Sequence, residues 1–252
     1  MKQILITGAT SGIGEQLALD YAKQSWLVYA CGRNSQKLDS LAEKNANIRS
    51  LAFDVTELEQ IQSAVQKLEG QLDLLVLNAG NCEYIDNPME FDAALFERII
   101  KVNLVSLGYC LEKCLPKIKS GGQLAIVSSS AAYLPFPRAT AYGSAKAGAS
   151  YLAKTLAIEL KPHNIDVSLV SPGFVKTPLT EKNEFDMPMR VSVDYASQAI
   201  IKGLAKRKKE VHFPSRFTFI LKLLAALPAP IWRAIAGKMI SASQTQPQRQ
   251  QP

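Results

Sequence analysis

The sequence has few of the residues that hold small disulfide-bonded or zinc-bound domains together. It contains four cysteines without a CxxC pair, and two histidines, His163 and His212. We therefore expect neither a disulfide framework nor a metal site. The start of the chain, Met1-Lys2-Gln3 followed by an apolar segment and a glycine turn, does not have the pattern of a signal peptide. Reduced thiols and a cytoplasmic location are the corresponding expectations.

The composition is that of an ordinary globular domain. The chain has 252 residues, of which 47% are hydrophobic and 20% are charged. A chain of this length can bury a core without covalent staples, and this balance argues against wholesale disorder. The end of the chain, 241–252, is rich in Gln, Ser and Pro without an apolar anchor, and is expected to be disordered.

Positive charge is concentrated near the C-terminus. Residues 202–252 hold ten of the 29 Lys and Arg residues but one of the 22 Asp and Glu residues, a formal charge of +9, so the first 201 residues carry −2. A basic segment of this kind suits either nucleic acid or an anionic membrane surface, depending on what lies between the charges.

Short apolar runs alternate with longer segments of helical pattern through most of the chain. The runs are almost entirely apolar, which is typical of strands buried on both faces. Regular alternation of this kind predicts an α/β fold with a parallel sheet and helices on both sides. The expected strands lie at 4–6, 27–30, 48–53, 74–77, 124–127 and 165–170, and the expected helices at 14–23, 35–44, 57–68, 91–115 and 142–160.

The first expected strand leads into a glycine-rich turn and then a helix. The turn reads Thr7-Gly8-Ala9-Thr10-Ser11-Gly12-Ile13-Gly14. Glycines let a backbone approach a pyrophosphate closely, and the amides of a following helix favour an anion. The spacing resembles the TGxxxGxG turn of the short-chain dehydrogenase/reductase family. The resemblance implies a single doubly wound Rossmann domain with a mostly seven-stranded sheet, over about residues 1–213.

Residues at the ends of later strands refine the expected cofactor. Cys31-Gly32-Arg33-Asn34 contains no acid to bind a ribose 2′-hydroxyl, and Arg33 offers a guanidinium to a 2′-phosphate, so NADP(H) is preferred and NAD stays open. The alternative is that Arg33 is simply solvated at a loop start. The family's NNAG motif has Leu77 in its first position here. By resemblance, the further cofactor contacts are Asp54, Val55, Asn78, Ala79 and Gly80.

A tyrosine and a lysine four residues apart match the family's YxxxK pattern. Tyr142 and Lys146 therefore share one helix face, and a neighbouring ammonium should lower the pKa of the phenol. Tyr142 is then the general acid or base. By resemblance, Lys146 also holds the nicotinamide ribose together with Tyr142, Ser129 binds the substrate oxygen, and Asn103 completes the relay through a water.

Pro172-Gly173-Phe174-Val175-Lys176-Thr177 resembles the family's PGxxxT motif. It implies that Pro172, Gly173, Val175 and Thr177 bind the nicotinamide carboxamide. The segment 178–193 corresponds to the family's substrate lid, and its Phe and Met residues suggest an apolar or lipid-like substrate. A mobile loop with incidental hydrophobic residues is the alternative.

The segment 214–240 is expected to be an amphipathic tail outside the family resemblance. Phe217, Ile220, Leu221 and Leu224 repeat at helical spacing, and cations flank the stripe. The run is interrupted before it reaches the roughly 18–20 apolar residues of a membrane span. Contact of 206–240 with an anionic membrane surface, on the inner face of a membrane, is one expectation. Packing over the substrate cleft or at a subunit interface is the other, and nucleic acid is not expected.

Together these features predict an enzyme that transfers hydride between NADP(H) and a small-molecule carbonyl or alcohol. By family habit, the helices at 91–115 and 142–160 should pair into a homodimer or homotetramer. A non-catalytic NADP-binding sensor is the rival interpretation, although all four relay residues are present. A sugar-nucleotide epimerase or dehydratase would need a larger C-terminal domain.

Overall fold

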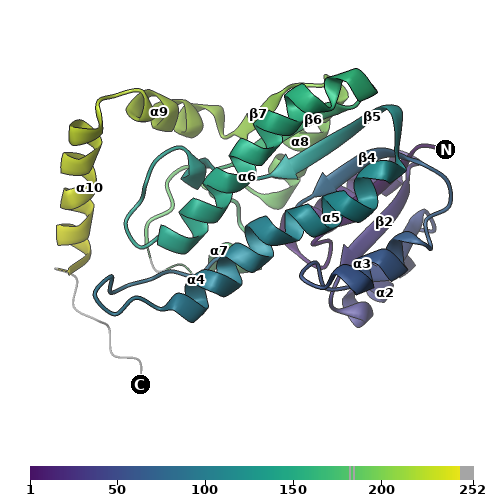
Figure 1. Cartoon of the computed structure of the whole chain (residues 1–252), viewed down its shortest axis with the longest axis horizontal. Helices are drawn as coiled ribbons and strands as arrows, with labels where there is room; N and C mark the ends of the chain where they lie inside the picture. Colours follow the sequence, from purple (N-terminus) through teal and green to yellow (C-terminus); the bar gives the residue numbers. More distant parts are fainter. Residues whose placement is uncertain (182, 184, 245–252) are drawn as a thin grey trace.

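Seven parallel strands form one sheet in the computed structural model, which describes residues 1–181, 183 and 185–244. The strand order is β3-β2-β1-β4-β5-β6-β7 (Figure 1). The doubly wound α/β fold predicted from the alternating pattern is confirmed. The strands are β1 (Gln3–Thr7), β2 (Leu27–Gly32), β3 (Ile48–Ala52), β4 (Leu72–Leu77), β5 (Ile118–Val127), β6 (Asp166–Pro172) and β7 (Glu210–Phe213).

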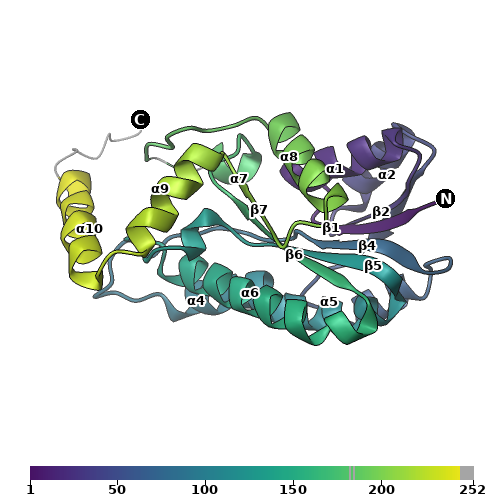
Figure 2. The same ribbon diagram turned by 90° about the horizontal axis from the view of Figure 1, so that it is seen from above.

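Helices cover both faces of the sheet, as Figure 2 shows. Leu5, Tyr29 and Leu75 belong to the core on one face, and Ile4 and Val76 belong to the core on the other. Consecutive strand residues thus enter different cores, which explains the continuous apolar runs. One face is covered by α1 (Gly12–Lys23), α2 (Ser35–Glu43) and α8 (Val193–Ala205), and the other by α3 (Leu58–Val65), α4 (Ala93–Ile100), α5 (Ser106–Cys114) and α6 (Thr140–Glu159).

The strand order reverses between β1 and β4. Leu5 of β1 pairs with Tyr29 of β2 on one side and with Leu75 of β4 on the other. The chain leaves β1 toward α1 on one face, and after β4 it continues into α4 on the other face. The connections therefore diverge at the carboxyl ends of these strands, which is where ligands bind in open α/β sheets.

The helix predicted over 91–115 is divided by a π-helical turn at Lys101–Val105. The side-chain amide of Asn103 donates to the carbonyl oxygen of Ile99 at 3.0 Å. In an α-helix this carbonyl would accept the backbone N–H of Asn103. The side chain thus takes over the acceptor, and the local turn widens at a predicted site residue.

Two helices follow the last strand: α9 (Ser215–Ala225) and α10 (Ala229–Gln244). They lie at the end of the molecule toward which the β5 arrow points, beyond the carboxyl ends of the strands (Figures 1 and 2). Helix α10 extends to Gln244 and so includes the first four residues of the segment 241–252, for which disorder was expected. Residues 245–252 lie outside the described part of the chain.

A buried carboxylate joins α1 to α8 beneath the glycine turn. The Asp20 carboxylate accepts hydrogen bonds from Ser197 Oγ at 2.7 Å, Gln198 Nε2 at 3.3 Å and Gln16 Nε2 at 3.1 Å. Ser197 is fully buried, so its hydroxyl depends on this acceptor. The contact fixes the helix that begins at the glycine turn against the helix that follows the lid.

We expect Asp20→Ala to lower the free energy of unfolding by about 1–3 kcal/mol, because it leaves a buried hydroxyl unpaired. Asp39→Ala is the matched control, since the Asp39 carboxylate accepts an exposed hydrogen bond from Ser50 and should change stability by less than about 0.5 kcal/mol. Urea denaturation of both variants measures the difference. Equal losses would refute the bridging role of Asp20.

Candidate active site

The glycine turn leaves the start of α1 open to an anion. Gly8 and Gly12 have φ angles of +70° and +57°, in the left-handed region that favours glycine. A Cβ at Gly14 would lie 2.2 Å from the carbonyl oxygen of Gly8, so a side chain there would close the turn. The N-cap residue Ser11 makes no side-chain bond to the first amides of α1. These amides remain available to a phosphate, and the turn fits a dinucleotide.

Hydrogen bonds hold the ends of β1 and β4 together beside this turn. Thr7 Oγ1 accepts the backbone N–H groups of Asn78 and Ala79, each at 3.0 Å. Asn78 Nδ2 donates in return to the Thr7 carbonyl oxygen at 3.0 Å. Asn78 and Ala79 therefore position the backbone at the point where the strand order reverses. Thr7 stands in the predicted glycine-rich motif, but this positioning role was missed from the sequence.

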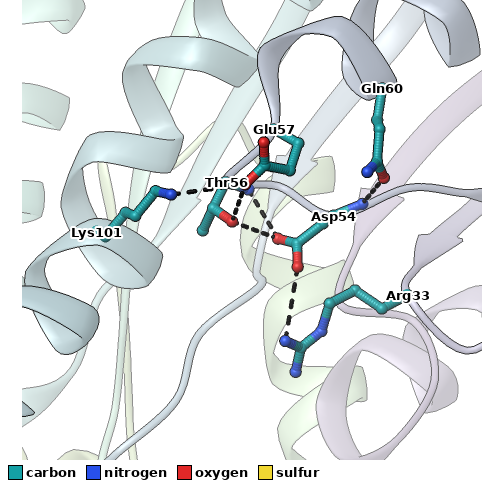
Figure 3. Close-up of polar contacts among 6 residues, drawn as sticks. All are labelled: Arg33, Asp54, Thr56, Glu57, Gln60 and Lys101. Carbon is teal, nitrogen blue, oxygen red and sulfur yellow. Dashed lines mark hydrogen bonds and ion pairs between the residues drawn. The ribbon is translucent and has the colours of Figure 1, made fainter.

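Arg33 and Asp54 face each other at the ends of β2 and β3, as Figure 3 shows. Arg33 Nη1 lies 3.6 Å from Asp54 Oδ2, while the Arg33 side chain remains 76% exposed. Burial works against ionisation of Asp54, but hydrogen bonds from Thr56 and the Arg33 guanidinium outweigh it and hold the Asp54 pKa below its usual value. Gln60 Oε1 accepts the backbone N–H of Asp54 at 2.9 Å. The guanidinium is thus held at the loop by a single ion pair and still faces solvent.

Lys146 carries its amine into the interior at the end of β5. Its side chain comes from α6, the residue is only 4% exposed, and Nζ donates to the carbonyl oxygen of Val127 at 3.1 Å. Burial lowers the pKa of Lys146 to about 8. The amine is therefore mostly charged at neutral pH and loses its proton at mildly alkaline pH.

Gly80 brings Lys146 and Asn103 to one point. A Cβ at Gly80 would lie 2.6 Å from Asn103 Oδ1 and 3.3 Å from Lys146 Nζ. Asn103 Nδ2 donates to the backbone and side-chain oxygens of Asn81 at 2.9 and 2.8 Å, so Asn103 Oδ1 points the other way. This oxygen is buried without a hydrogen-bond partner among the described residues. It is an acceptor available to a polar group between Asn103 and Lys146.

Tyr142 lies one helical turn before Lys146 on α6. Lys146 Nζ is 5.7 Å from the centre of the phenol ring. Burial raises the Tyr142 pKa above its usual value, Cys82 adds to the rise, and the Ser129 hydroxyl acts in the opposite direction. The expected lowering of the Tyr142 pKa by Lys146 is therefore wrong for the protein alone, because desolvation of the phenolate dominates and the ammonium points to Val127.

The PGxxxT segment is fastened to the glycine turn and to the base of the lid. A Cβ at Gly12 would lie 3.0 Å from Thr177 Cγ2, so the two loops are in contact. Thr180 Oγ1 donates to the Val175 carbonyl oxygen at 2.5 Å, and Val191 N donates to the Phe174 carbonyl oxygen at 2.9 Å. Both ends of the segment 178–193 are therefore held, and α7 (Pro178–Glu181) forms its first turn.

Aromatic rings line the space between the lid segment and α9. Phe185 makes edge-on contacts with Tyr84 and Phe174 at centroid distances of 5.6 and 6.0 Å. Phe174 lies 5.5 Å from Phe217 of α9. Phe185 was predicted from the sequence, whereas Tyr84 and the reach of Phe217 were missed. Tyr84 stands four residues after Gly80 in the sequence. Its closeness to the Asn78-Ala79-Gly80 motif is the feature of the sequence that could have indicated a place near the site.

The structure brings the predicted site residues to one edge of the sheet. Tyr142, Lys146, Asn103 and Gly80 are linked by the contacts above, and the glycine turn meets Thr177. Val55 is buried at the end of β3, next to Asp54. Pro172 is the last residue of β6, and a Cβ at Gly173 would lie 2.9 Å from Phe217 Cδ1.

Comparisons with known proteins agree with this fold. A sequence profile described as short chain dehydrogenase matches residues 2–187. An uncharacterised oxidoreductase of Myxococcus xanthus is 30% identical over 93% of this chain and 96% of its own length. The 11-beta-hydroxysteroid dehydrogenase-like protein 3 of Arabidopsis thaliana is 30% identical over 88% of this chain and 76% of its own length. The chain belongs to the short-chain dehydrogenase/reductase family.

Solved structures show the same architecture. A short-chain dehydrogenase from Sphingobium yanoikuyae, determined in complex with NADPH, has a TM-score of 0.77 and 24% identity, and the match covers all of this chain and 99% of that one. A 3-ketoacyl-ACP reductase from Sinorhizobium meliloti has a TM-score of 0.75 and 27% identity, covering 84% of this chain and 96% of its own. The expected fold is thereby confirmed, and the family to which the chain belongs consists of oxidoreductases that use nicotinamide cofactors.

The lowered pKa of Lys146 predicts a pH dependence of cofactor binding. Affinity for NADPH should be constant below about pH 8 and fall above it, because the neutral amine no longer attracts the ribose hydroxyls as strongly. Fluorescence titration of NADPH across the pH range measures this without turnover. The Lys146→Met variant should bind NADPH weakly at every pH, without a fall in affinity above about pH 8. If the variant showed the same fall as the wild type, the titrating group would be another residue.

Proposed function

We propose that the protein is an NADP(H)-dependent oxidoreductase that transfers hydride between nicotinamide and an apolar, lipid-like carbonyl or alcohol. The observation that carries the proposal is the meeting of Lys146 and Asn103 at Gly80, with the Tyr142 ring 5.7 Å from Lys146 Nζ. A general acid and a buried ammonium at the carboxyl edge of the sheet suit reduction of a carbonyl next to a bound dinucleotide.

The chain's own residues suit each part of the cofactor. The turn from Gly8 to Gly14, including Thr10, Ser11 and Ile13, would hold the pyrophosphate, and Asp54 and Val55 the adenine. Tyr142 and Lys146 would hold the nicotinamide ribose, and the segment from Pro172 to Thr177 the carboxamide. When bound, the cofactor supplies the hydride. The protein residues orient it and handle the proton.

The proton step follows from the state of Tyr142 and Lys146. Since burial raises its pKa, Tyr142 holds its proton at neutral pH and can donate it from the phenol oxygen to the oxygen of a carbonyl undergoing reduction. The Ser129 hydroxyl would donate a second hydrogen bond to the same oxygen. The Lys146 ammonium stabilises the phenolate that remains, and Asn103 Oδ1 faces the path by which it is reprotonated.

Arg33 supports a preference for NADP(H). No carboxylate stands at the end of β2 to bind the ribose 2′-hydroxyl, and the exposed Arg33 guanidinium is free to rotate from Asp54 toward a 2′-phosphate. The NADPH complex of the Sphingobium protein agrees with this choice. The alternative is an Arg33 that is solvated and paired only with Asp54, and the Arg33→Ala variant below distinguishes the two.

The aromatic lining supports an apolar substrate. Tyr84, Phe174 and Phe185 form a connected set of rings on the lid side of the site. Relatives named as hydroxysteroid dehydrogenases and a ketoacyl reductase point to bulky or long apolar carbonyl compounds. We also propose a cytoplasmic homodimer or homotetramer, formed through exposed α6 residues such as Tyr151 and Ile158.

Arg33→Ala should weaken NADPH binding about 10- to 100-fold and leave NADH binding nearly unchanged, because a charge-assisted hydrogen bond contributes about 1.5–3 kcal/mol. Dissociation constants for both cofactors measure the effect. Arg49→Ala is the matched control, since Arg49 lies on β3 and donates to the Ala46 carbonyl oxygen. Equal losses for NADPH and NADH would remove the 2′-phosphate role.

Tyr142→Phe should lower kcat by at least about 100-fold with little change in NADPH affinity, since it removes the general acid and keeps the ring. NADPH oxidation with ketones and aldehydes of rising chain length provides the assay, and kcat/KM should increase with apolar length. Ser130→Ala, next to Ser129, is the control for a lost hydroxyl. Full activity in the Tyr142→Phe variant would assign the general acid to another group, whereas NADPH binding by the wild type without measurable carbonyl reduction would favour a cofactor-binding sensor.

A further inference from the structure

The last two helices have an inner side that packs on the site and an outer side that does not. On the inner side, Trp232 Nε1 donates to the Pro135 carbonyl oxygen at 3.0 Å, and the Trp232 ring meets Phe136 edge-on at 5.3 Å. Leu221 and Trp232 form a buried cluster with Leu134. The inner side thus rests on the loop between Ser129 and Tyr142, and the tail is anchored to the substrate side of the enzyme.

The outer side exposes large apolar side chains on both helices. Six of these side chains have exposed fractions of 37–59%. A group of exposed apolar side chains of this size is unfavourable in water. Ile231 and Ile235 also line a shallow apolar groove with Lys238. We call this set the outer apolar face: Phe219, Ile220, Leu223, Leu227, Ile231 and Ile235.

Charge on these helices is of one sign. The segment 215–244 contains Arg216, Lys222, Arg233 and Lys238 and no Asp or Glu. Arg216, Arg233 and Lys238 are exposed. The acid that precedes α9, Glu210, is already engaged: it accepts hydrogen bonds from Lys222 Nζ and Tyr133 Oη, each at 2.7 Å. The outer apolar face therefore lies on two helices that carry exposed cations and no acid, and Lys238 lies beside it in the groove.

We propose that the outer apolar face docks on an anionic lipid surface. Apolar side chains flanked by cations match the interface of a bilayer, where the side chains enter the acyl boundary and the cations meet the headgroups. A second copy is a poorer occupant, because two-fold pairing would bring the same cations together without acids between them. Nucleic acid would satisfy the charges and leave the apolar residues in water.

The docking is peripheral. Among the helices of the described residues, no segment combines the length and hydropathy that a bilayer crossing requires. The inner side stays fastened to the enzyme through Trp232 and through the Lys222–Glu210–Tyr133 contacts. This arrangement would place the aromatic lining next to the lipid from which an apolar substrate arrives, a consequence that rests on the proposed function.

Co-sedimentation with vesicles tests the proposal on the full-length chain, without cofactor or substrate. The wild type should bind vesicles of phosphatidylcholine with phosphatidylglycerol and bind phosphatidylcholine alone much more weakly, with affinity falling as salt rises. Ile220→Ser with Leu223→Ser should weaken binding on the order of tenfold or more. Arg233→Glu with Lys238→Glu should do the same on the anionic vesicles.

Matched controls make the result specific. Met89→Ser with Tyr195→Ser removes two exposed apolar side chains outside the C-terminal helices and outside α6, and Lys67→Glu with Lys161→Glu reverses two exposed lysines elsewhere. Both should bind like the wild type. Circular dichroism checks that every variant is folded, and sedimentation velocity records its oligomeric state.

Three outcomes would overturn the proposal: no vesicle binding by the wild type, binding that is equal for anionic and neutral lipid, or an oligomer that dissociates in the Ile220→Ser, Leu223→Ser variant without any lipid affinity. The last outcome would assign the face to a subunit interface. Tyr142→Phe should bind vesicles normally, so a failure of the proposed chemistry is separable from a failure of docking.

Discussion

The buried ammonium of Lys146 is the constraint on which the site depends. Taking a charge out of water is costly unless oxygen atoms replace the lost solvent. The Val127 carbonyl oxygen does so, Asn103 Oδ1 lies close by, and Gly80 leaves the space between them open. The side-chain nitrogen of Asn103 donates to oxygen atoms of Ile99 and Asn81, while its oxygen and the ammonium both lie beside Gly80. Asn103 and Val127 thus place oxygen atoms on the side of the site where the charge is buried.

The C-terminal helices extend this arrangement outward. Glu210, at the start of β7, binds Lys222 of α9 and Tyr133 of the loop after Ser129. Burial raises the pKa of the Glu210 carboxyl. The hydrogen bonds from Lys222 and Tyr133 and the charge of the Lys222 ammonium lower it, and the resulting pKa lies below the usual value. The position of α9 is therefore coupled to the substrate loop through an ionised carboxylate. Helix α9 thus contacts both this loop, through Lys222, and Gly173, through Phe217.

Much of the fold was predictable from the sequence. Strands that are buried on both faces appear as continuous apolar runs, and a helix between two successive strands indicates that they pair in parallel. The spacing of Tyr142 and Lys146 also predicted correctly that both residues lie on one helix. What escaped the sequence depends on tertiary contacts. The π-helical turn at Asn103 arises from a side-chain amide competing for a backbone carbonyl, which helical periodicity does not encode. The raised pKa of Tyr142 reflects desolvation by burial, with a further electrostatic contribution from Cys82, and not its spacing from Lys146. The amphipathic stripe of the tail predicted a helix but not which side would face the enzyme.

Arg33 and Lys146 are cations at the same edge of the sheet, but they differ in their exposure to water. Arg33 is mostly exposed, so its attraction for a phosphate is moderated by water and screened by salt. Lys146 is almost fully buried, where the effective dielectric is lower and the same charge acts more strongly on a neighbouring phenol. In the proposed function, the exposed Arg33 would select the cofactor weakly and reversibly, as suits a ligand that must leave after each turnover. The buried Lys146 ammonium would stabilise the phenolate more strongly, while the proton is away. The depth of each charge would then separate cofactor binding from chemistry in this site.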